Sequence, residues 1–152
     1  RRTWPRGIRG RNFVMTCFAS IIDPKANTIT FANAGHNFPY FYRKDESGKG
    51  QFGALMTRGN RLGDLQESKY VAKEMPLQSN DVLVWYTDGI VECENLAGEE
   101  FGEKRFRAAI RRAEEKEPAE MRTEVVASAQ TFFGEKIRKD DITLVFARIY
   151  GS

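Results

Sequence analysis

The chain has 152 residues, of which 41% are hydrophobic and 30% are charged, and its formal net charge is +3. This length and balance are typical of one soluble globular domain with a single sizeable core. No apolar run approaches the ~20 residues that span a bilayer, and no secretory leader opens the chain. We therefore expect a soluble, cytoplasmic protein without a membrane segment.

Much of the positive charge lies at the beginning of the chain, in a basic N-terminal arm over residues 1–12. No acidic residue interrupts its five arginines, which are Arg1, Arg2, Arg6, Arg9 and Arg11. Such an arm can bind nucleic acid, but it can also be a solvated linker. No ladder of aromatic residues or repeated basic face follows it, so we favour the linker and expect no nucleic-acid partner.

The first half of the chain reads as a series of strands. Phe13 to Ile22 is apolar on both alternating faces, which predicts a strand covered on both sides. The segment Asp23-Pro24-Lys25-Ala26-Asn27 has the composition of a turn. Further strands are expected over the ranges 28–34, 38–42, 51–56, 69–75 and 81–86. A second turn is expected at 45–50.

The hydrophobic period then changes from strand to helix. Apolar residues spaced at i, i+3, i+4 and i+7 predict an amphipathic helix over about 102–116. Pro118 suits the first turn of a second helix, Gly134 suits its C-terminal cap, and residues 142–149 predict a last strand. The expected buried stripe of the second helix is Met121, Val125, Ala129 and Phe132. This order of elements indicates an α+β fold, with helices on one face of a largely antiparallel sheet.

The two cysteines, Cys17 and Cys93, both lie among apolar neighbours. Two cysteines are too few for a structural zinc site or a disulfide framework. We expect both to be free thiols.

Acidic residues stand at the ends of two apolar strands. Asp88 follows the segment 82–86, where Gly89 allows a sharp exit, and Asp140 and Asp141 directly precede the last strand. If the two strands are neighbours, these carboxylates converge at one rim, and oxygen ligands are those that Mg²⁺ and Mn²⁺ prefer. The alternative is that they are turn formers.

His36 is the single histidine of the chain, in the segment Ala34-Gly35-His36-Asn37. No second histidine or nearby nucleophile supports a catalytic triad. The sequence also contains neither of the glycine-rich phosphate-binding loops of nucleotide-dependent enzymes. The residues alone leave a structural role for His36 as the first interpretation.

Six short segments occur in an order that resembles the C-terminal signature of SpoIIE/RsbU-type phosphatases, which are bacterial relatives of the PPM/PP2C serine/threonine phosphatases. The segments are Phe13-Val14-Met15-Thr16, Asn33-Ala34-Gly35-His36-Asn37-Phe38-Pro39, Leu62-Gly63, Tyr86-Thr87-Asp88-Gly89-Ile90-Val91-Glu92, Phe101-Gly102 and Asp140-Asp141-Ile142-Thr143. Each segment is weak evidence alone, but together they cover nearly the whole chain. Residues 13–152 therefore resemble the C-terminal portion of such a domain.

The resemblance implies a PP2C-like β-sandwich flanked by helices in α-β-β-α layers, here without its N-terminal portion. It also implies two Mn²⁺ or Mg²⁺ ions in the complete domain, and hydrolysis of phosphoserine or phosphothreonine by a water that the two ions activate. By similarity, Asp88 and Asp140 are metal ligands, whereas Asp141, Gly89 and His36 are accessory. No catalytic residue beyond the metal ligands is identified.

The chain also departs from the family pattern. The family carries further metal-binding aspartates in an upstream Gly-Asp-x-x-Gly-His-Gly segment, and nothing before Phe13 matches it. Before Asp81 the family favours Pro-Gly, where this chain has Gln78-Ser79-Asn80; Asn80 can adopt the same left-handed turn. We therefore expect this chain alone to be weakly active or inactive.

The function implied by the resemblance is dephosphorylation of a signalling protein such as a STAS-type anti-sigma-factor antagonist. An upstream sensor or receiver domain is expected in the parent protein, and a homodimer is a further expected assembly. The alternative is a non-catalytic, phosphatase-like binding module. A nucleic-acid-binding domain, suggested by the basic arm alone, is a second alternative that salt-dependent retention on DNA would test.

Overall fold

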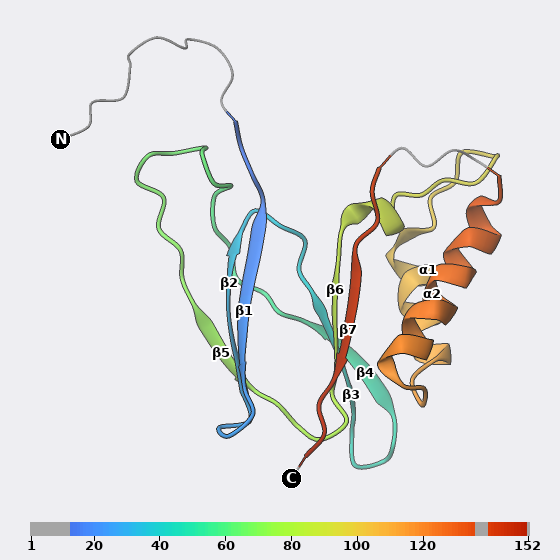
Figure 1. Ribbon diagram of the computed structural model, residues 1–152, viewed down its shortest axis with the longest axis horizontal. Coiled ribbons are helices and arrows are strands. Elements are labelled where there is room, and N and C mark those ends of the chain that lie inside the picture. Colours follow the sequence, from blue (N-terminus) through green and yellow to red (C-terminus); the bar gives the residue numbers. More distant parts are fainter. Residues whose placement is uncertain (1–12, 136–139, 152) are drawn as a thin grey trace.

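The computed structural model describes residues 13–135 and 140–151, so the basic N-terminal arm lies outside the described residues. Within these described residues, seven strands and two α-helices follow one another in the order that the sequence indicates (Figure 1). The strands are β1 (Cys17–Asp23), β2 (Thr28–Ala34), β3 (Tyr40–Lys44), β4 (Gly50–Ala54), β5 (Lys73–Pro76), β6 (Val82–Tyr86) and β7 (Leu144–Arg148). The helices are η1 (Asp88–Ile90, a 3₁₀ turn), α1 (Gly102–Arg112) and α2 (Pro118–Phe133).

The strands form two antiparallel sheets that face each other. One sheet has the strand order β1-β2-β5, and the other has the order β4-β3-β6-β7. Helices α1 and α2 lie against the outer face of the four-stranded sheet (Figure 1). This confirms the α+β class that the sequence pattern predicts and the β-sandwich that the resemblance implies, with a helix pair on one outer face of the described chain.

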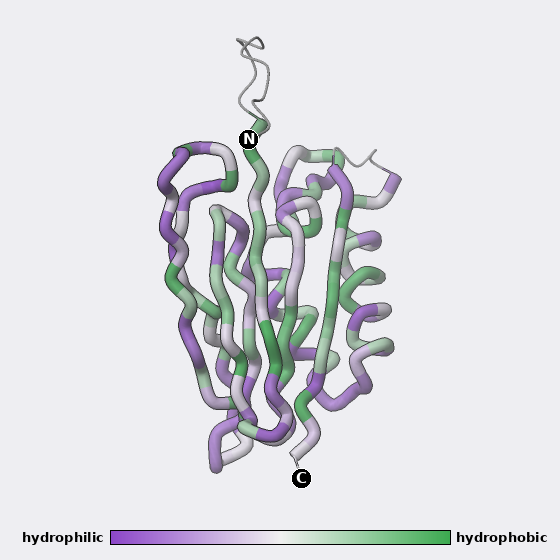
Figure 2. Tube along the Cα trace, turned by 60° about the vertical axis from the view of Figure 1, so that its left-hand side comes forward, coloured by the Kyte–Doolittle hydropathy of each residue, from purple (hydrophilic) through white to green (hydrophobic). Residues whose placement is uncertain are grey.

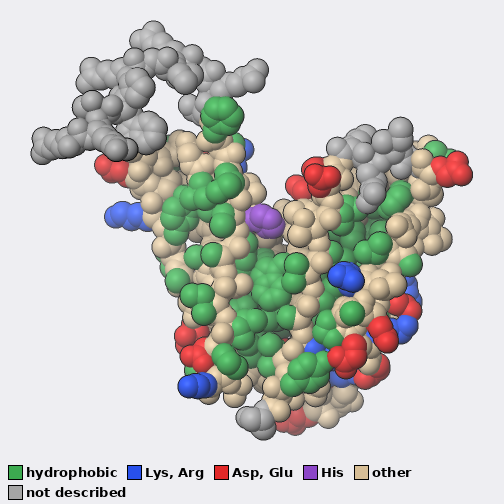
Figure 3. Space-filling model, in the orientation of Figure 1, with side chains coloured by type: hydrophobic (Ala, Val, Ile, Leu, Met, Phe, Trp, Pro, Cys, Tyr) green, Lys and Arg blue, Asp and Glu red, His purple; other side chains and the backbone are tan. Residues whose placement is uncertain are grey.

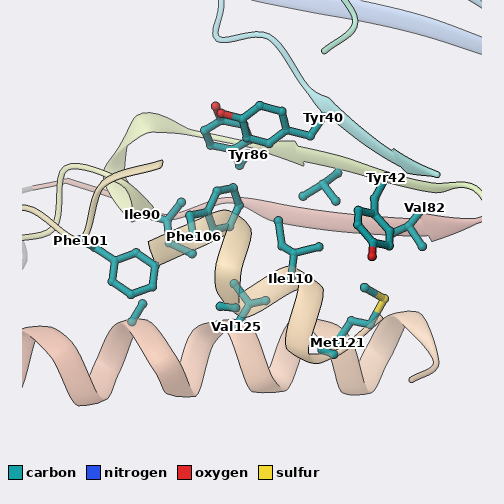
Figure 4. Packing of buried hydrophobic residues seen from close by; sticks show 14 of the residues in the cluster. Tyr40, Tyr42, Val82, Tyr86, Ile90, Phe101, Phe106, Ile110, Met121 and Val125 are labelled. Atoms are coloured by element: carbon teal, nitrogen blue, oxygen red, sulfur yellow. The ribbon is translucent and has the colours of Figure 1, made fainter. Parts of the chain in front are cut away.

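Two hydrophobic clusters hold these layers together. Between the two sheets, Ile29, Phe31, Leu55, Leu77 and Leu83 are buried. Between the four-stranded sheet and the helices lies a larger cluster that contains most of the aromatic packing (Figure 4). In it, the rings of Tyr40 and Tyr86 stack with centroids 5.4 Å apart, and Tyr86 contacts Phe106 of α1 at 4.9 Å.

The prediction that residues 13–22 form a strand covered on both sides is wrong. The strand begins at Cys17, and β1 is the edge of the three-stranded sheet. Its inward residue Phe18 stacks on Phe31, but the outward Ile21 is 73% exposed. Before β1, Met15 makes only an isolated antiparallel bridge to Leu62.

Both helices confirm the sequence prediction, with small differences. In Figure 2, apolar and polar residues alternate along them, as expected for helices with one buried side. Helix α1 ends at Arg112, earlier than predicted, while α2 begins at Pro118 and ends at the cap Gly134. The buried stripe of α2 ends on Phe133, with Phe132 only half-buried.

A buried ion pair joins β3 to the turn that precedes β6. The side chain of Asp81 is fully buried and accepts two hydrogen bonds from Arg43, at 2.7 and 2.6 Å, and one from the main chain of Gln78 at 2.8 Å. The bonds to Asp81 raise the pKa of Arg43. Asn80 has the positive φ of 69° expected for this turn.

Cys17 and Cys93 are free thiols, as predicted. Within the described residues, no helix is long and apolar enough to cross a membrane.

Candidate metal centre

The acidic residues that the sequence analysis selected lie at one rim of the four-stranded sheet. Strands β6 and β7 pair in antiparallel fashion, with Tyr86 opposite Leu144. The C-terminal end of β6 and the N-terminal end of β7 therefore meet at the same edge, and Asp88 lies just beyond one and Asp140 and Asp141 just beyond the other. The two segments are 52 residues apart in sequence, and the sheet brings them together.

One threonine extends the pairing beyond the last residues of the two strands. The main-chain N–H of Thr87 donates to the carbonyl of Thr143 at 3.0 Å. The Thr87 hydroxyl accepts the Thr143 N–H at 2.9 Å and donates to the carbonyl of Asp141 at 3.2 Å. We call these three hydrogen bonds the Thr87 clamp, and they fix the main chain that carries the acidic residues.

Gly89 is needed for the close approach of the two acidic segments. A Cβ atom at this position would lie 2.5 Å from the main-chain oxygen of Asp141, which is too short for any side chain. The sequence analysis attributed Gly89 to a sharp exit from the strand. The structure gives a further reason, which is contact with the opposite strand end.

The three carboxyl groups are exposed at this rim. Asp88 opens the η1 turn, where its main-chain carbonyl accepts the N–H groups of Val91 and Glu92, each at 2.9 Å. Asp140 Oδ1 accepts the N–H of Asp141 at 2.8 Å. This bond orients the Asp140 side chain and leaves its second oxygen, Oδ2, for another partner.

His36 lies near Asp88 but is tied to its own loop. Its main-chain N–H and C=O bond the side chain of Asn33, at 2.8 and 2.9 Å, and its Nδ1 lies 3.0 Å from the carbonyl of Asn37. A carbonyl only accepts, so Nδ1 carries the proton in this contact. These bonds give His36 a role in shaping the loop.

A pocket of about 500 Å³ lies beside Asp88 and contains groups that the sequence analysis missed. Its lining includes Tyr40, Tyr86, Glu103 and Arg107. Burial raises the pKa of Tyr40 and of Tyr86, so both hydroxyls stay protonated near neutral pH. The only sequence signal for these residues was their place on a buried strand or on the helix that covers it. Figure 3 shows a hollow between the two sides of the molecule, with hydrophobic side chains along its floor, whereas Tyr40 and Tyr86 lie on the helix side of the four-stranded sheet (Figure 4).

The ligand atoms available at the rim are oxygens, which are the type that a hard divalent cation prefers. Carboxylate and main-chain oxygens are the ligands of Mg²⁺ and Mn²⁺, and Asp88, Asp140 and Asp141 supply them from two adjoining strand ends. In residues 13–135 and 140–151, however, no three His, Cys, Asp or Glu side chains lie close enough to hold a metal ion. The described residues therefore do not form a complete metal site by themselves.

The sequence matches one protein family over almost its whole length. A family model described as Stage II sporulation protein E (SpoIIE) matches residues 6–150. Protein IcfG of Synechocystis sp. is 28% identical over 91 residues, which are 60% of this chain and 14% of that protein. The phosphoserine phosphatase RsbU of Bacillus subtilis is 27% identical over 84 residues, which are 55% of this chain and 24% of that protein.

Solved structures share the fold. The SiaA-PP2C domain of Pseudomonas aeruginosa superposes with a TM-score of 0.72 at 24% identity, over 88% of this chain and 51% of that one. The phosphatase domain of SpoIIE from Bacillus subtilis, presoaked with Mn, gives a TM-score of 0.64 at 20% identity, over 90% of this chain and 57% of that one.

This chain thus spans about half of each of these two solved domains and a quarter or less of the two curated relatives. Its two antiparallel sheets and its helix pair are those of a PP2C-like fold. With the family match over residues 6–150, they show that the chain belongs to the SpoIIE family.

Proposed function

We propose that this chain carries the C-terminal part of the active site of a metal-dependent protein serine/threonine phosphatase. The reaction is hydrolysis of a phosphoserine or phosphothreonine ester in a signalling protein. The proposal rests on one observation, which is that the Thr87 clamp joins two acidic strand ends at one rim. Family membership supports the same reaction class.

In this proposal Asp88 and Asp140 are the metal ligands, and Asp141 and Gly89 are accessory. Bound Mn²⁺ or Mg²⁺ would lower the pKa of water and offset the negative charge of the phosphoryl group. Two divalent ions need several carboxylates, so the remaining ligands come from residues outside those described. That this chain covers about half of the solved phosphatase domains supports such a division.

The chain's own groups position the ligands and shape the pocket. The Thr87 clamp and the contact of Gly89 with Asp141 hold the two acidic segments at a constant separation. His36 maintains its loop through Asn33 and takes no part as a general base. The hydroxyls of Tyr40 and Tyr86 line the pocket, where that of Tyr40 interacts with Tyr86 and Glu103.

The substrate that we propose is a phosphorylated partner protein of the anti-sigma-factor antagonist (STAS) class. The name of one relative, the phosphoserine phosphatase RsbU, supports a phosphoserine substrate. A solved relative from Mycobacterium tuberculosis, Rv1364c, contains RsbU and RsbW domains, which supports a place in a multidomain signalling protein.

The test is Mn²⁺-dependent release of phosphate from a phosphoserine peptide by the full-length protein. We expect Asp88→Asn and Asp140→Asn each to lower kcat by at least a hundredfold, because each removes one anionic ligand. Glu120→Gln, which makes the same charge change on the exposed side of α2, should have no effect.

His36→Ala should lower activity far less than Asp88→Asn, and equal losses would show that the assigned roles are wrong. Full activity in both Asp variants would remove the metal-ligand assignment. No activity in the wild-type protein would favour the alternative, a phosphatase-like binding module.

A further inference from the structure

The outer edge of β4 leads into the pocket beside Asp88. Strand β4 is the last strand of its sheet, and it runs from Gly50 toward the rim that carries the acidic residues (Figure 1). Ala54, at its end, lines the same pocket as Arg107 and the acidic residues Asp88, Glu92 and Glu103. A chain that pairs with this edge would therefore extend into the candidate metal centre.

The hydrogen-bond pattern shows which main-chain groups β4 presents outward. The pairs Pro39–Leu55 and Asp45–Lys49 are hydrogen-bonded pairs between β3 and β4. Bonded and non-bonded pairs alternate in an antiparallel ladder, so Phe52 and Ala54 direct their N–H and C=O groups away from β3. Within the described residues, no other main-chain group bonds to them.

Two arginines of α1 stand along this edge. Arg107 and Arg111 are one helical turn apart, and their guanidinium groups lie over the rings of Tyr40 and Phe52, at 5.7 and 5.5 Å from the ring centroids. The nearest acid to Arg107 is the exposed Glu103, at 3.6 Å, which is a long and solvent-screened ion pair. Both arginines thus present guanidinium groups on the helix side of the β4 edge, where Glu114 also lies and accepts a hydrogen bond from the Tyr42 hydroxyl.

The alternation of side chains along a strand connects the outer edge of β4 with Arg107 and Arg111 of α1. Phe52 and Ala54 are paired with Tyr42 and Tyr40, whose side chains lie in the cluster between the sheet and the helices. A strand added beside β4 would direct every second side chain to this same helix side. Two side chains, two residues apart, would then face Arg111 and Arg107.

We propose that the outer edge of β4 binds an extended, acidic segment of the phosphoprotein substrate by β-strand addition. Main-chain bonds to Phe52 and Ala54 align the segment, its phosphoserine enters the pocket of Asp88 and Arg107, and an acidic side chain two residues away contacts Arg111. Strand addition supplies affinity through the main chain and specificity through alternate side chains. This inference rests on the proposed phosphatase function and adds its substrate specificity.

Binding can be measured apart from hydrolysis, by fluorescence anisotropy with the 152-residue chain in EDTA. The probe is a fluorescein-labelled octapeptide of β-forming residues, with a phosphoserine and a Glu two positions away. We expect Arg107→Gln and Arg111→Gln each to weaken binding about tenfold, because each removes a charge-assisted hydrogen bond. Lys104→Gln loses the same charge at an exposed position of α1 and should bind as the wild type does.

Two modified peptides test the main-chain pairing. N-methylation of one alternate set of residues removes the donors that face β4, whereas methylation of the other set leaves them intact. We expect the first peptide to bind at least tenfold more weakly than the second. Equal affinity of the two peptides, or equal affinity of Arg107→Gln and Lys104→Gln, would overturn the inference.

Hydrolysis of the same peptide by the full-length protein with Mn²⁺ separates this inference from the proposed function. Replacing the Glu of the peptide by Lys should lower kcat/KM about tenfold. Hydrolysis of the Glu and Lys peptides at equal rates would refute the edge site alone. Edge-dependent binding without any hydrolysis would refute the phosphatase function alone.

Discussion

Thr87 uses one hydroxyl group for two hydrogen bonds that cross from β6 to the segment before β7. The hydroxyl accepts from Thr143 and donates to Asp141. Thr87→Val keeps the shape of the side chain but removes both bonds. We expect it to lower the free energy of unfolding by about 1–2 kcal/mol, as measured by urea denaturation, and to weaken Mn²⁺ binding as well.

The matched control is Thr87→Ser, which keeps the hydroxyl. It should retain most of the stability and nearly all of the Mn²⁺ affinity. If Val and Ser variants bind Mn²⁺ equally well, the Thr87 clamp does not position the ligands.

Tyr40 and Tyr86 make the stability of the protein sensitive to alkaline pH. Burial raises the pKa of both hydroxyls above the ordinary value of about 10. The unfolded chain therefore loses these protons at a lower pH than the native protein does. Below the unfolded pKa the stabilisation is fully present, and it is lost as pH rises from about 10 toward the native values.

The measurement is the free energy of unfolding in urea between pH 8 and pH 11. We expect it to fall above pH 10, and to fall less steeply in Tyr40→Phe, which has no hydroxyl to ionise. Identical slopes for wild type and Tyr40→Phe would show that this hydroxyl titrates alike in the native and unfolded chains.

Asp88 and Asp140 could be selected from the sequence because each adjoins a dense apolar strand. The role of Thr87 could not be predicted from the sequence, since its hydrogen-bond partners lie 54 and 56 positions further along the chain. The same holds for Asp81, whose ion pair with Arg43 depends on a turn closing against β3. The local sequence pattern identifies residues at strand ends. The contacts of those residues depend on which strands pair, and the local pattern does not specify this pairing.

Helix α2 ends at a main-chain conformation that suits glycine alone. Gly134 has φ 59° and ψ −128°, and no atom lies within 4 Å of the position that a Cβ would occupy. Gly134→Ala therefore meets only conformational strain, and we expect a loss of about 1–2 kcal/mol in thermal or urea unfolding. Gly134→Asn should do no better, because ψ is far from the left-handed helical value that Asn tolerates.

Thr131→Ala serves as a control in the same last turn, at an exposed position. It should change stability by less than about 0.5 kcal/mol. A Gly134→Ala variant as stable as Thr131→Ala would show that the helix end adapts without cost.

Strand β1 shows the limit of prediction at the scale of elements. Its apolar residues alternate onto both faces, which predicted burial on both sides, yet Ile21 is largely exposed. An apolar pattern states which side chains can be buried, but not which part of the molecule covers them. The existence and order of the other strands and both helices were predicted correctly, while several ends shifted by two or more residues because turns and caps decide them.

The layer arrangement of the whole molecule follows from long-range pairing. Strand β6 lies between β3 and β7, so residues 40–44, 82–86 and 144–148 form one continuous sheet. The sequence indicated the class of this fold, and the six-segment resemblance indicated the family, which the match over residues 6–150 confirms. The division into a three-stranded and a four-stranded sheet could not be predicted, because equal strand patterns suit either sheet.

The proposed metal centre belongs to the same scale. A site for two divalent ions would need more carboxylates than Asp88, Asp140 and Asp141 supply. We therefore expect the 152-residue chain to bind Mn²⁺ weakly, and a version extended to the full phosphatase domain to bind it at least tenfold more tightly.

The most direct test of the metal centre is calorimetric titration of Mn²⁺ into the full domain and its variants. Asp88→Asn and Asp140→Asn should each weaken binding at least tenfold, because each removes an anionic ligand, while Glu120→Gln should match the wild type. Unchanged Mn²⁺ affinity in both Asp variants would contradict the assignment of this rim as the metal site.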